Sequence, residues 1–260
     1  MLRALAAGAA LLLAACSPEA PPEVQAPPTP RFHDIDGHKI WGVCTAGGGP
    51  TVVYLHALDA DSSTFATVAQ RVAKAEPDVR QCSFDRVNTG ASSFDTARRP
   101  LTAAVAELEA FLDDEGVDGP LVLVGQSYGG LVALAYAGAH PDRTQAMVIG
   151  DSPLPFEAEL LRGSRRDSVR ELFRGNRERV DLFEAYATAG SHPVPDVPLV
   201  YVDATQDVLP TVLQVPAAEY ERALTAYVDA LPQGRLVRSP SVHNTVINSS
   251  EFLAAILDQL

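Results

Sequence analysis

The chain has 260 residues, 47% of them apolar, and its 33 acidic against 20 basic residues give a formal net charge of −13. A chain of this length and apolar content can bury one sizeable core, and length alone is compatible with one or two domains. The acidic excess argues against nucleic acid as a partner, because a phosphate backbone attracts basic surfaces.

The first 15 residues predict an export signal. Arg3 is followed by an apolar stretch that ends at Leu13 and by small residues before Cys16. This is the layout of a secretory signal, and the stretch is too short to span a bilayer. Leu13-Ala14-Ala15-Cys16 is similar to the lipobox of bacterial lipoproteins. The similarity implies cleavage before Cys16 and acylation of its thiol, hence an exported chain anchored by lipid to the bacterial cell envelope. The alternative is an ordinary secretory signal.

The next segment predicts a tether. Residues 16–31 contain the cysteine and a proline-rich stretch with little apolar bulk, which cannot bury enough surface to fold. The folded domain is therefore expected to begin near Phe32. We divide it into a core of residues 32–151 and 196–260 and an inserted cap of residues 152–195.

Strand-like and helix-like segments alternate through the core, which is typical of a doubly wound α/β sheet. Short apolar runs predict strands at residues 33–35, 39–44, 51–56, 80–85, 121–125, 146–150, 199–203 and 235–238. Apolar residues at helical spacing predict helices at residues 64–75, 101–115, 131–139, 217–230 and 250–260.

The cap interrupts this alternation with a run of helix-like sequence. Arg166, Arg170 and Arg174 are spaced four apart, so they share one helix face. The stripe is interpreted as a solvated face paired with acidic neighbours, namely Asp167, Glu171 and Glu178. The alternatives are contact with anionic head groups and binding of a substrate carboxylate.

Gly125-Gln126-Ser127-Tyr128-Gly129 fits the G-x-S-x-G pattern of a nucleophile elbow and follows an apolar run at residues 120–124. A tight strand-to-helix turn exposes the serine hydroxyl at the tip of a sheet, where a base can activate it. Glycines flank the serine because the crowded turn leaves no room for a Cβ. The alternative is a glycine-rich connection with an incidental serine.

With the elbow placed, the order of elements resembles the α/β-hydrolase superfamily over most of the mature domain. Residues 50–59 look like its third strand and the following His-Gly loop. Residues 82–86, with Gly90-Ala91-Ser92, look like its fourth strand and the Asp-Arg-x-x-x-Gly-x-Ser turn. His243-Asn244 fits the place of the catalytic histidine. The resemblance implies a mostly parallel eight-stranded sheet flanked by helices, with a small helical cap.

The resemblance also implies a catalytic triad in the chain order nucleophile, acid and histidine. Ser127 is the expected nucleophile and His243 the expected base. Asp207 is the preferred acid, because it follows the apolar run that comes after the cap. Asp203 and Asp151 are its rivals.

The backbone N–H groups of Tyr128 and Leu58 are expected to form the oxyanion hole. Ala57 stands where the family usually has glycine, which makes the Leu58 donor the weaker of the two assignments. Leu58, Leu154 and Phe156 are predicted as walls of the substrate pocket.

Two cysteines remain beyond the signal, Cys44 and Cys82, and an even pair in an exported protein is a candidate disulfide. Two free buried thiols are the alternative. In the superfamily's strand order the second strand lies antiparallel beside the fourth, which implies that the two cysteines are within bridging reach.

The sequence thus predicts a serine hydrolase, a carboxylesterase that cleaves a small-molecule ester through an acyl-enzyme. No cofactor and no metal are expected. A peptidase, a thioesterase, an acyltransferase or a cofactor-free haloperoxidase are alternatives within the superfamily. The alternative from another class is a non-catalytic, lipid-anchored binding module on the same fold.

Overall fold

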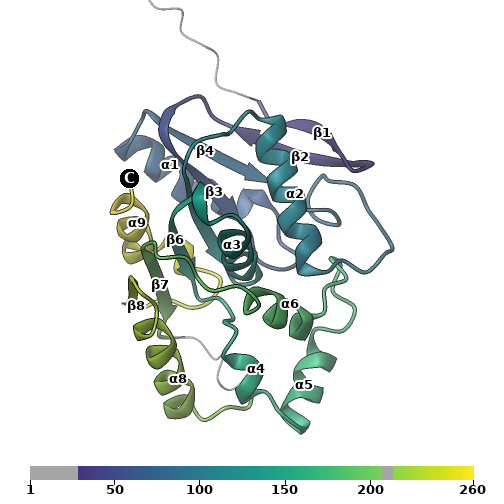
Figure 1. Cartoon of the computed structure of the whole chain (residues 1–260), viewed down its shortest axis with the longest axis vertical. Helices are drawn as coiled ribbons and strands as arrows, with labels where there is room; N and C mark the ends of the chain where they lie inside the picture. Colours follow the sequence, from purple (N-terminus) through teal and green to yellow (C-terminus); the bar gives the residue numbers. More distant parts are fainter. Residues whose placement is uncertain (1–28, 207–212) are drawn as a thin grey trace, which may run out of the picture.

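The computed structural model describes residues 29–206 and 213–260. In this part of the chain, eight strands form one sheet in the order β1-β2-β4-β3-β5-β6-β7-β8 (Figure 1). The strands are β1 (Arg31–Ile35), β2 (His38–Cys44), β3 (Gly48–Leu55), β4 (Val79–Phe84), β5 (Leu121–Gln126), β6 (Thr144–Gly150), β7 (Leu199–Ala204) and β8 (Gly234–Ser239). Each strand expected from an apolar run is present.

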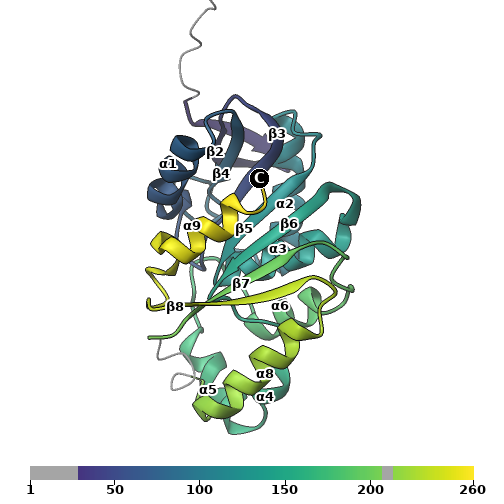
Figure 2. The ribbon, with the colours of Figure 1, turned by 90° about the vertical axis from the view of Figure 1, so that its left-hand side faces the viewer.

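Helices cover both faces of the sheet. They are α1 (Ala66–Ala75), α2 (Leu101–Asp114), α3 (Tyr128–Ala139), α4 (Glu157–Leu160), α5 (Ser164–Leu172), α6 (Leu182–Ala189), α8 (Ala217–Asp229) and α9 (Ser250–Leu257). Helices α1 and α9 lie on one face, and α2 and α3 lie on the other (Figures 1 and 2). Two apolar clusters match these faces, because Val68 and Phe252 belong to one and Leu108 and Leu131 to the other.

The sheet is parallel from β4 through β3 to β8, whereas β1 and β2 run antiparallel to their neighbours. Every residue of β5 is buried, as expected for a central strand covered on both faces. The carboxyl ends of β5, β6 and β7 therefore lie at one edge of the sheet. Residues that directly follow these strands are brought together there.

The predicted disulfide joins the antiparallel pair. Cys44 lies opposite Cys82 in the register of β2 and β4, and their sulfur atoms are bonded. The bridge closes a separation of 38 residues. The prediction of a Cys44–Cys82 disulfide is confirmed.

Helices α4, α5 and α6 follow one another between β6 and β7, in the segment predicted as a cap. No helix of residues 29–206 and 213–260 is long and apolar enough to cross a membrane. Cys16, the predicted signal and Asp207 lie outside the described residues, so the predictions made for them stay predictions.

Candidate active site

Ser127 lies in a sharp turn between β5 and α3. Its backbone adopts φ 52° and ψ −125°, a left-handed conformation that costs a non-glycine residue on the order of 1–3 kcal/mol. A Cβ on Gly125 would lie 2.6 Å from the Gly129 carbonyl oxygen, and one on Gly129 would lie 1.9 Å from the Leu55 carbonyl oxygen. Both flanking glycines are therefore required by close backbone approach, as the elbow pattern predicts.

Neighbouring groups hold the turn in place. The Ser152 hydroxyl donates a hydrogen bond to the Ser127 carbonyl at 2.6 Å. The Ser127 N–H donates to the Gly150 carbonyl at 3.2 Å. The strained backbone is thus fixed by the end of β6 and by the residues that follow it.

His243 lies in the loop that follows β8, and a carboxylate contacts its ring. Its Nδ1 atom is 2.7 Å from Asp151 Oδ2, and the Asp151 side chain is only 3% exposed. The Gln126 amide donates to the His243 carbonyl at 2.7 Å, which ties the histidine loop to the residue before Ser127. With Nδ1 on a carboxylate, the geometry of a triad assigns the role of base to Nε2.

Asp151 is held at the end of β6. Its φ is 42°, and its N–H donates to the Val202 carbonyl at 2.9 Å. Asp203, the other rival, lies on β7 and forms an ion pair with Arg238 of β8 at 2.5 Å. Asp207, the preferred acid, lies outside the described residues. Among the described residues, the carboxylate that contacts the His243 ring is therefore that of Asp151.

Ser127 and His243 line the same cavity, which has a volume of about 300 Å³. Leu58 and Tyr128, expected at the oxyanion hole, line it too. The remaining lining residues are Pro153, Glu157, Phe173, Leu182, Tyr186, Leu213 and Asn244.

Leu154 and Phe156, predicted as pocket walls, are not among the described residues that line this cavity. Leu154 is fully buried in the core. The Phe156 ring packs against Tyr220 and Tyr227, with ring centroids 5.9 and 5.5 Å apart. The reason is local, since the chain enters α4 with the next residue, Glu157, facing the cavity.

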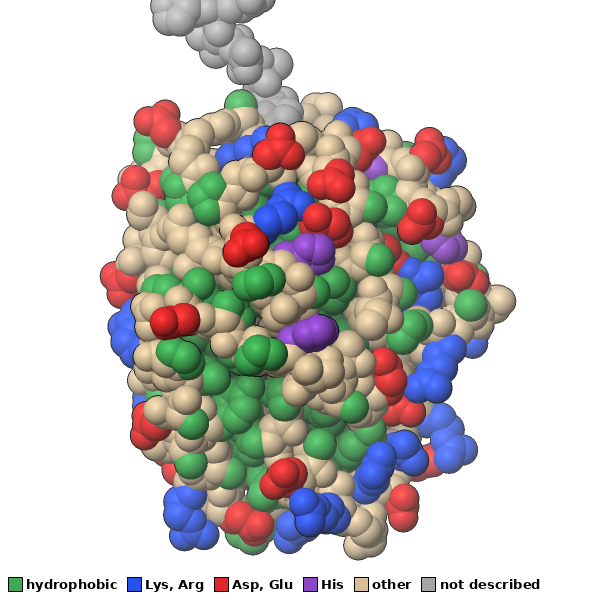
Figure 3. Space-filling view, viewed as in Figure 1, with side chains coloured by type: hydrophobic (Ala, Val, Ile, Leu, Met, Phe, Trp, Pro, Cys, Tyr) green, Lys and Arg blue, Asp and Glu red, His purple; other side chains and the backbone are tan. Residues whose placement is uncertain are grey.

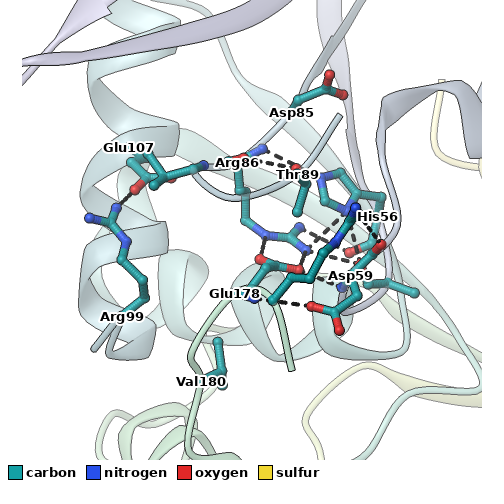
Figure 4. A network of polar contacts seen from close by, with 12 residues as sticks. His56, Asp59, Asp85, Arg86, Thr89, Arg99, Glu107, Glu178 and Val180 are labelled. Carbon is teal, nitrogen blue, oxygen red and sulfur yellow. Dashed lines mark hydrogen bonds and ion pairs between the residues drawn. The ribbon is translucent and has the colours of Figure 1, made fainter. Parts of the chain in front are cut away.

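A buried ion pair fixes the loop that carries Leu58 (Figure 4). The Arg86 guanidinium donates to the carbonyl oxygens of His56 at 2.9 Å and Ala57 at 3.0 Å. It also donates to both carboxylate oxygens of Glu178, at 2.7 and 2.9 Å. Glu178 in turn accepts the Asp59 N–H at 2.7 Å. The backbone is therefore held on both sides of Leu58.

Sequence reasoning missed both roles. Arg86 belongs to the Asp-Arg-x-x-x-Gly-x-Ser pattern, which assigns no contact to its side chain, and the sequence predicts Glu178 as a partner of the cap arginines. A fully buried arginine is paired with a carboxylate as a rule, because an isolated charge is expensive to bury. The rule does not indicate which carboxylate is the partner, and Glu178 lies 92 residues from Arg86 in the sequence. The sequence therefore carries no signal for the Arg86–Glu178 contact.

His56, next to this pair, is buried and remains uncharged at neutral pH. Burial and the adjacent Arg86 guanidinium lower its pKa well below the usual range. It therefore serves the loop as a neutral polar side chain.

Glu157 is a second buried carboxyl in the cavity wall. It accepts hydrogen bonds from the hydroxyls of Tyr186 at 2.8 Å and Tyr220 at 2.9 Å. The Leu154 N–H is 3.3 Å from the same carboxyl. Burial raises the pKa of Glu157 to about 7 despite these donors. The carboxyl thus joins α4, α6 and α8 and gains a proton near neutral pH.

Among the residues that the structure describes, no group of three or more His, Cys, Asp or Glu side chains is arranged to hold a metal ion.

A model of the alpha/beta hydrolase family matches residues 52–254, and the chain belongs to that family. Lipase LipV of Mycobacterium tuberculosis is 34% identical to it over 137 residues, which is 53% of this chain and 50% of LipV. The match thus spans about half the length of that relative.

Solved structures show the same fold at low sequence identity. The enol-lactonase from Burkholderia xenovorans is 18% identical, with a TM-score of 0.60 over 88% of this chain and 98% of that one. Alpha/beta hydrolase domain-containing protein 10 from mouse is 17% identical, with a TM-score of 0.65 over 88% and 96%. The expected fold class, an eight-stranded mostly parallel sheet flanked by helices, is confirmed.

We expect Glu178→Gln to lower kcat toward a small ester at least about tenfold, because one oxyanion donor contributes roughly 3 kcal/mol and the Leu58 loop would lose its anchor. KM should change less. Steady-state kinetics of the folded variant measure both constants. Glu159→Gln, an exposed cap glutamate, is the control; equal kcat values for the two variants would contradict a positioning role for Glu178.

Glu157 makes stability depend on pH with a defined sign. Its carboxyl ionises near 4.5 when unfolded and about 7 when folded, a difference of about 2.5. The stability contributed by its protonated form is complete below pH 4.5 and is lost as pH rises through about 7, a loss of about 3 kcal/mol.

Glu157→Gln removes this titration, so its free energy of unfolding should fall less than that of the wild type between about pH 5 and about pH 8. Urea unfolding at both pH values measures the difference. Glu76→Gln, at an exposed position, should behave like the wild type. If the Glu157→Gln curve runs parallel to the wild-type curve, the assigned pKa is wrong.

Proposed function

We propose that the chain is a serine hydrolase that cleaves carboxylic esters of small molecules through an acyl-enzyme intermediate. The observation that carries the proposal is one cavity bordered by Ser127, on its strained turn, and by His243, whose Nδ1 contacts the buried Asp151. Family membership and the similarity to LipV support hydrolase chemistry. The cavity, about 300 Å³, is at the small end of ligand pockets and suits a short acyl group.

In this mechanism Ser127 Oγ attacks the ester carbonyl carbon while His243 Nε2 takes its proton. Asp151 orients the imidazole and stabilises the imidazolium that forms. The N–H groups of Tyr128 and Leu58 bind the oxyanion. Tyr128 is the first residue of α3, so its N–H has no acceptor within the helix and faces the favourable end of the helix dipole.

The intermediate collapses as His243 returns the proton to the leaving alcohol. Water then attacks the acyl-enzyme with His243 as base, and the acid product leaves Ser127. Glu157 takes no part in these transfers, since it is already bound to two tyrosine hydroxyls.

The wild type should hydrolyse 4-nitrophenyl butyrate, and Ser127→Ala should reduce kcat by roughly a million-fold, as loss of the nucleophile does in serine hydrolases. Ser191→Ala, at an exposed loop position, is the matched control and should retain activity. A folded wild type that releases no 4-nitrophenol would favour the binding-module alternative, whereas an alanine variant as active as the wild type would exclude Ser127 as the nucleophile.

The acid assignment has its own test. Asp151→Asn should lower kcat by about four orders of magnitude, because the amide holds the imidazole in the wrong tautomer. Asp207→Asn, the change at the acid favoured by sequence, should lower it much less. The reverse order in the two kcat values would reassign the acid to Asp207 and leave the hydrolase proposal in place.

The same proposal includes export and lipid anchoring through Cys16. Its support is the lipobox-like sequence ahead of a proline-rich tether. Expressed in a bacterial host, the wild type should partition into detergent and carry a diacylglyceryl mass at Cys16. Cys16→Ser should lose both properties; a soluble, unmodified wild type would argue for an ordinary secretory signal.

A further inference from the structure

A second hollow, of about 850 Å³, lies beside the catalytic cavity and is bordered by arginines. We call it the arginine basin. Figure 3 shows the blue side chains gathered over α5, at the lower right of the view. The arginines of the basin are Arg98, Arg170, Arg174, Arg177 and Arg179, and its apolar residues are Phe94, Phe173, Val180, Leu182 and Phe183.

The basin carries more positive charge than its own carboxylates balance. Asp181 is its one acidic lining residue among those described, and it is shared by Arg98 at 3.4 Å and Arg170 at 3.9 Å. The same carboxylate also caps α6, by accepting the Phe183 N–H at 2.9 Å. The lining of the basin therefore contains one carboxylate, that of Asp181, and five guanidinium groups.

Of the three acidic neighbours predicted to pair with the stripe, Glu171 does so, with its carboxylate 2.7 Å from Arg174. Glu178 is instead buried against Arg86, and Asp167 does not line the basin. Among the described residues, Arg177 donates to the Asp59 carbonyl at 3.0 Å and Arg179 lies over the Phe94 ring, and neither forms an ion pair with a carboxylate. On a chain with a net charge of −13, this is a local site of the opposite sign.

Aromatic rings help to orient the guanidinium groups. Arg170 lies over the Phe183 ring at 5.4 Å, and Arg179 lies over Phe94 at 5.8 Å. A guanidinium that stacks on a ring keeps N–H groups at its edge for a carboxylate or a phosphate. Phe94 is 67% exposed, so apolar surface is open beside these donors.

The arginine basin and the catalytic cavity share a wall. Phe173 and Leu182 line both. A ligand with an anionic group in the basin can therefore place its apolar part along these side chains and reach the cavity that contains Ser127.

We infer that the arginine basin is the subsite for an anionic group of the substrate, so that the enzyme prefers esters that also carry a carboxylate or a phosphate. This inference rests on the proposed esterase function and narrows its substrate class. A concave site beside the cavity suits part of a substrate better than the flat surface of a membrane.

The test compares 4-nitrophenyl hemiesters of glutaric, adipic and suberic acid with the neutral pentanoate, hexanoate and octanoate esters of equal length. The quantity measured is the kcat/KM for the anionic ester divided by the kcat/KM for the neutral ester of equal length. For at least one length, this ratio should be about three- to tenfold lower in Arg170→Gln/Arg174→Gln than in the wild type. Added salt should lower the wild-type ratio, because exposed charges are screened.

The control is Arg222→Gln/Arg235→Gln, which removes the same charge from α8 and β8 at exposed positions. Its ratio should equal that of the wild type. If the control lowers the ratio as much as the basin variant does, the effect is one of net charge and the subsite is rejected. If neutral esters are hydrolysed but the ratio is the same in all three proteins, the subsite fails while the esterase function stands.

A measurement without turnover separates the two claims further. Octyl phosphate should bind to Ser127→Ala in calorimetry, and the basin substitutions added to that variant should weaken binding about three- to tenfold. Unchanged binding would overturn the inference. Loss of binding to phosphatidylglycerol vesicles, with octyl phosphate affinity unaffected, would instead assign the arginines to a membrane surface.

Discussion

The ion pair between Arg86 and Glu178 connects the three parts of the molecule that the candidate site needs. Arg86 follows β4, Glu178 lies between α5 and α6, and the carbonyl oxygens of His56 and Ala57 belong to the loop after β3. Both side chains are almost fully buried. Removing one partner of such a pair leaves an uncompensated buried charge, which costs about 3–5 kcal/mol. The contact therefore fixes where the cap sits relative to Leu58.

The sheet supplies the rest of the site through one edge. Ser127 follows β5, Asp151 follows β6 and His243 follows β8, and in a parallel sheet these ends point the same way. Ser127 and Asp151 both have positive φ values, 52° and 42°. The surrounding hydrogen bonds maintain this backbone strain at two successive strand ends. Strained backbone conformations of this kind are common at active sites, where side chains must be held in one orientation.

The parts of this arrangement that follow from local pattern were predictable. The apolar runs located the strands, the spacing of glycines around Ser127 matched the elbow pattern, and the resemblance to the α/β-hydrolase superfamily implied the Cys44–Cys82 bridge through that family's strand order. In each case neighbouring residues, or the fixed geometry of paired strands, determine the outcome.

The parts that depend on long-range packing were not predictable. The choice of the triad acid among Asp151, Asp203 and Asp207 depends on the position of the loop that carries His243. All three aspartates lie at or near the end of a predicted strand, so the sequence does not distinguish them. Leu154 and Phe156 were expected in the pocket, but the direction of the chain entering α4 turns Glu157 there instead. The sequence around Glu178 is rich in arginine and is typical of a charged surface. Nothing in it indicates that the partner of Glu178 is Arg86, in the loop that follows β4.

The central claim is that Ser127 is an activated nucleophile in the folded protein. Labelling with a fluorophosphonate probe, followed by mass spectrometry of the digested protein, tests it most directly. The account predicts a single adduct on the peptide containing Ser127, formed by the native protein and absent after denaturation. A native protein that forms no adduct, or one labelled elsewhere to the same extent, would contradict it.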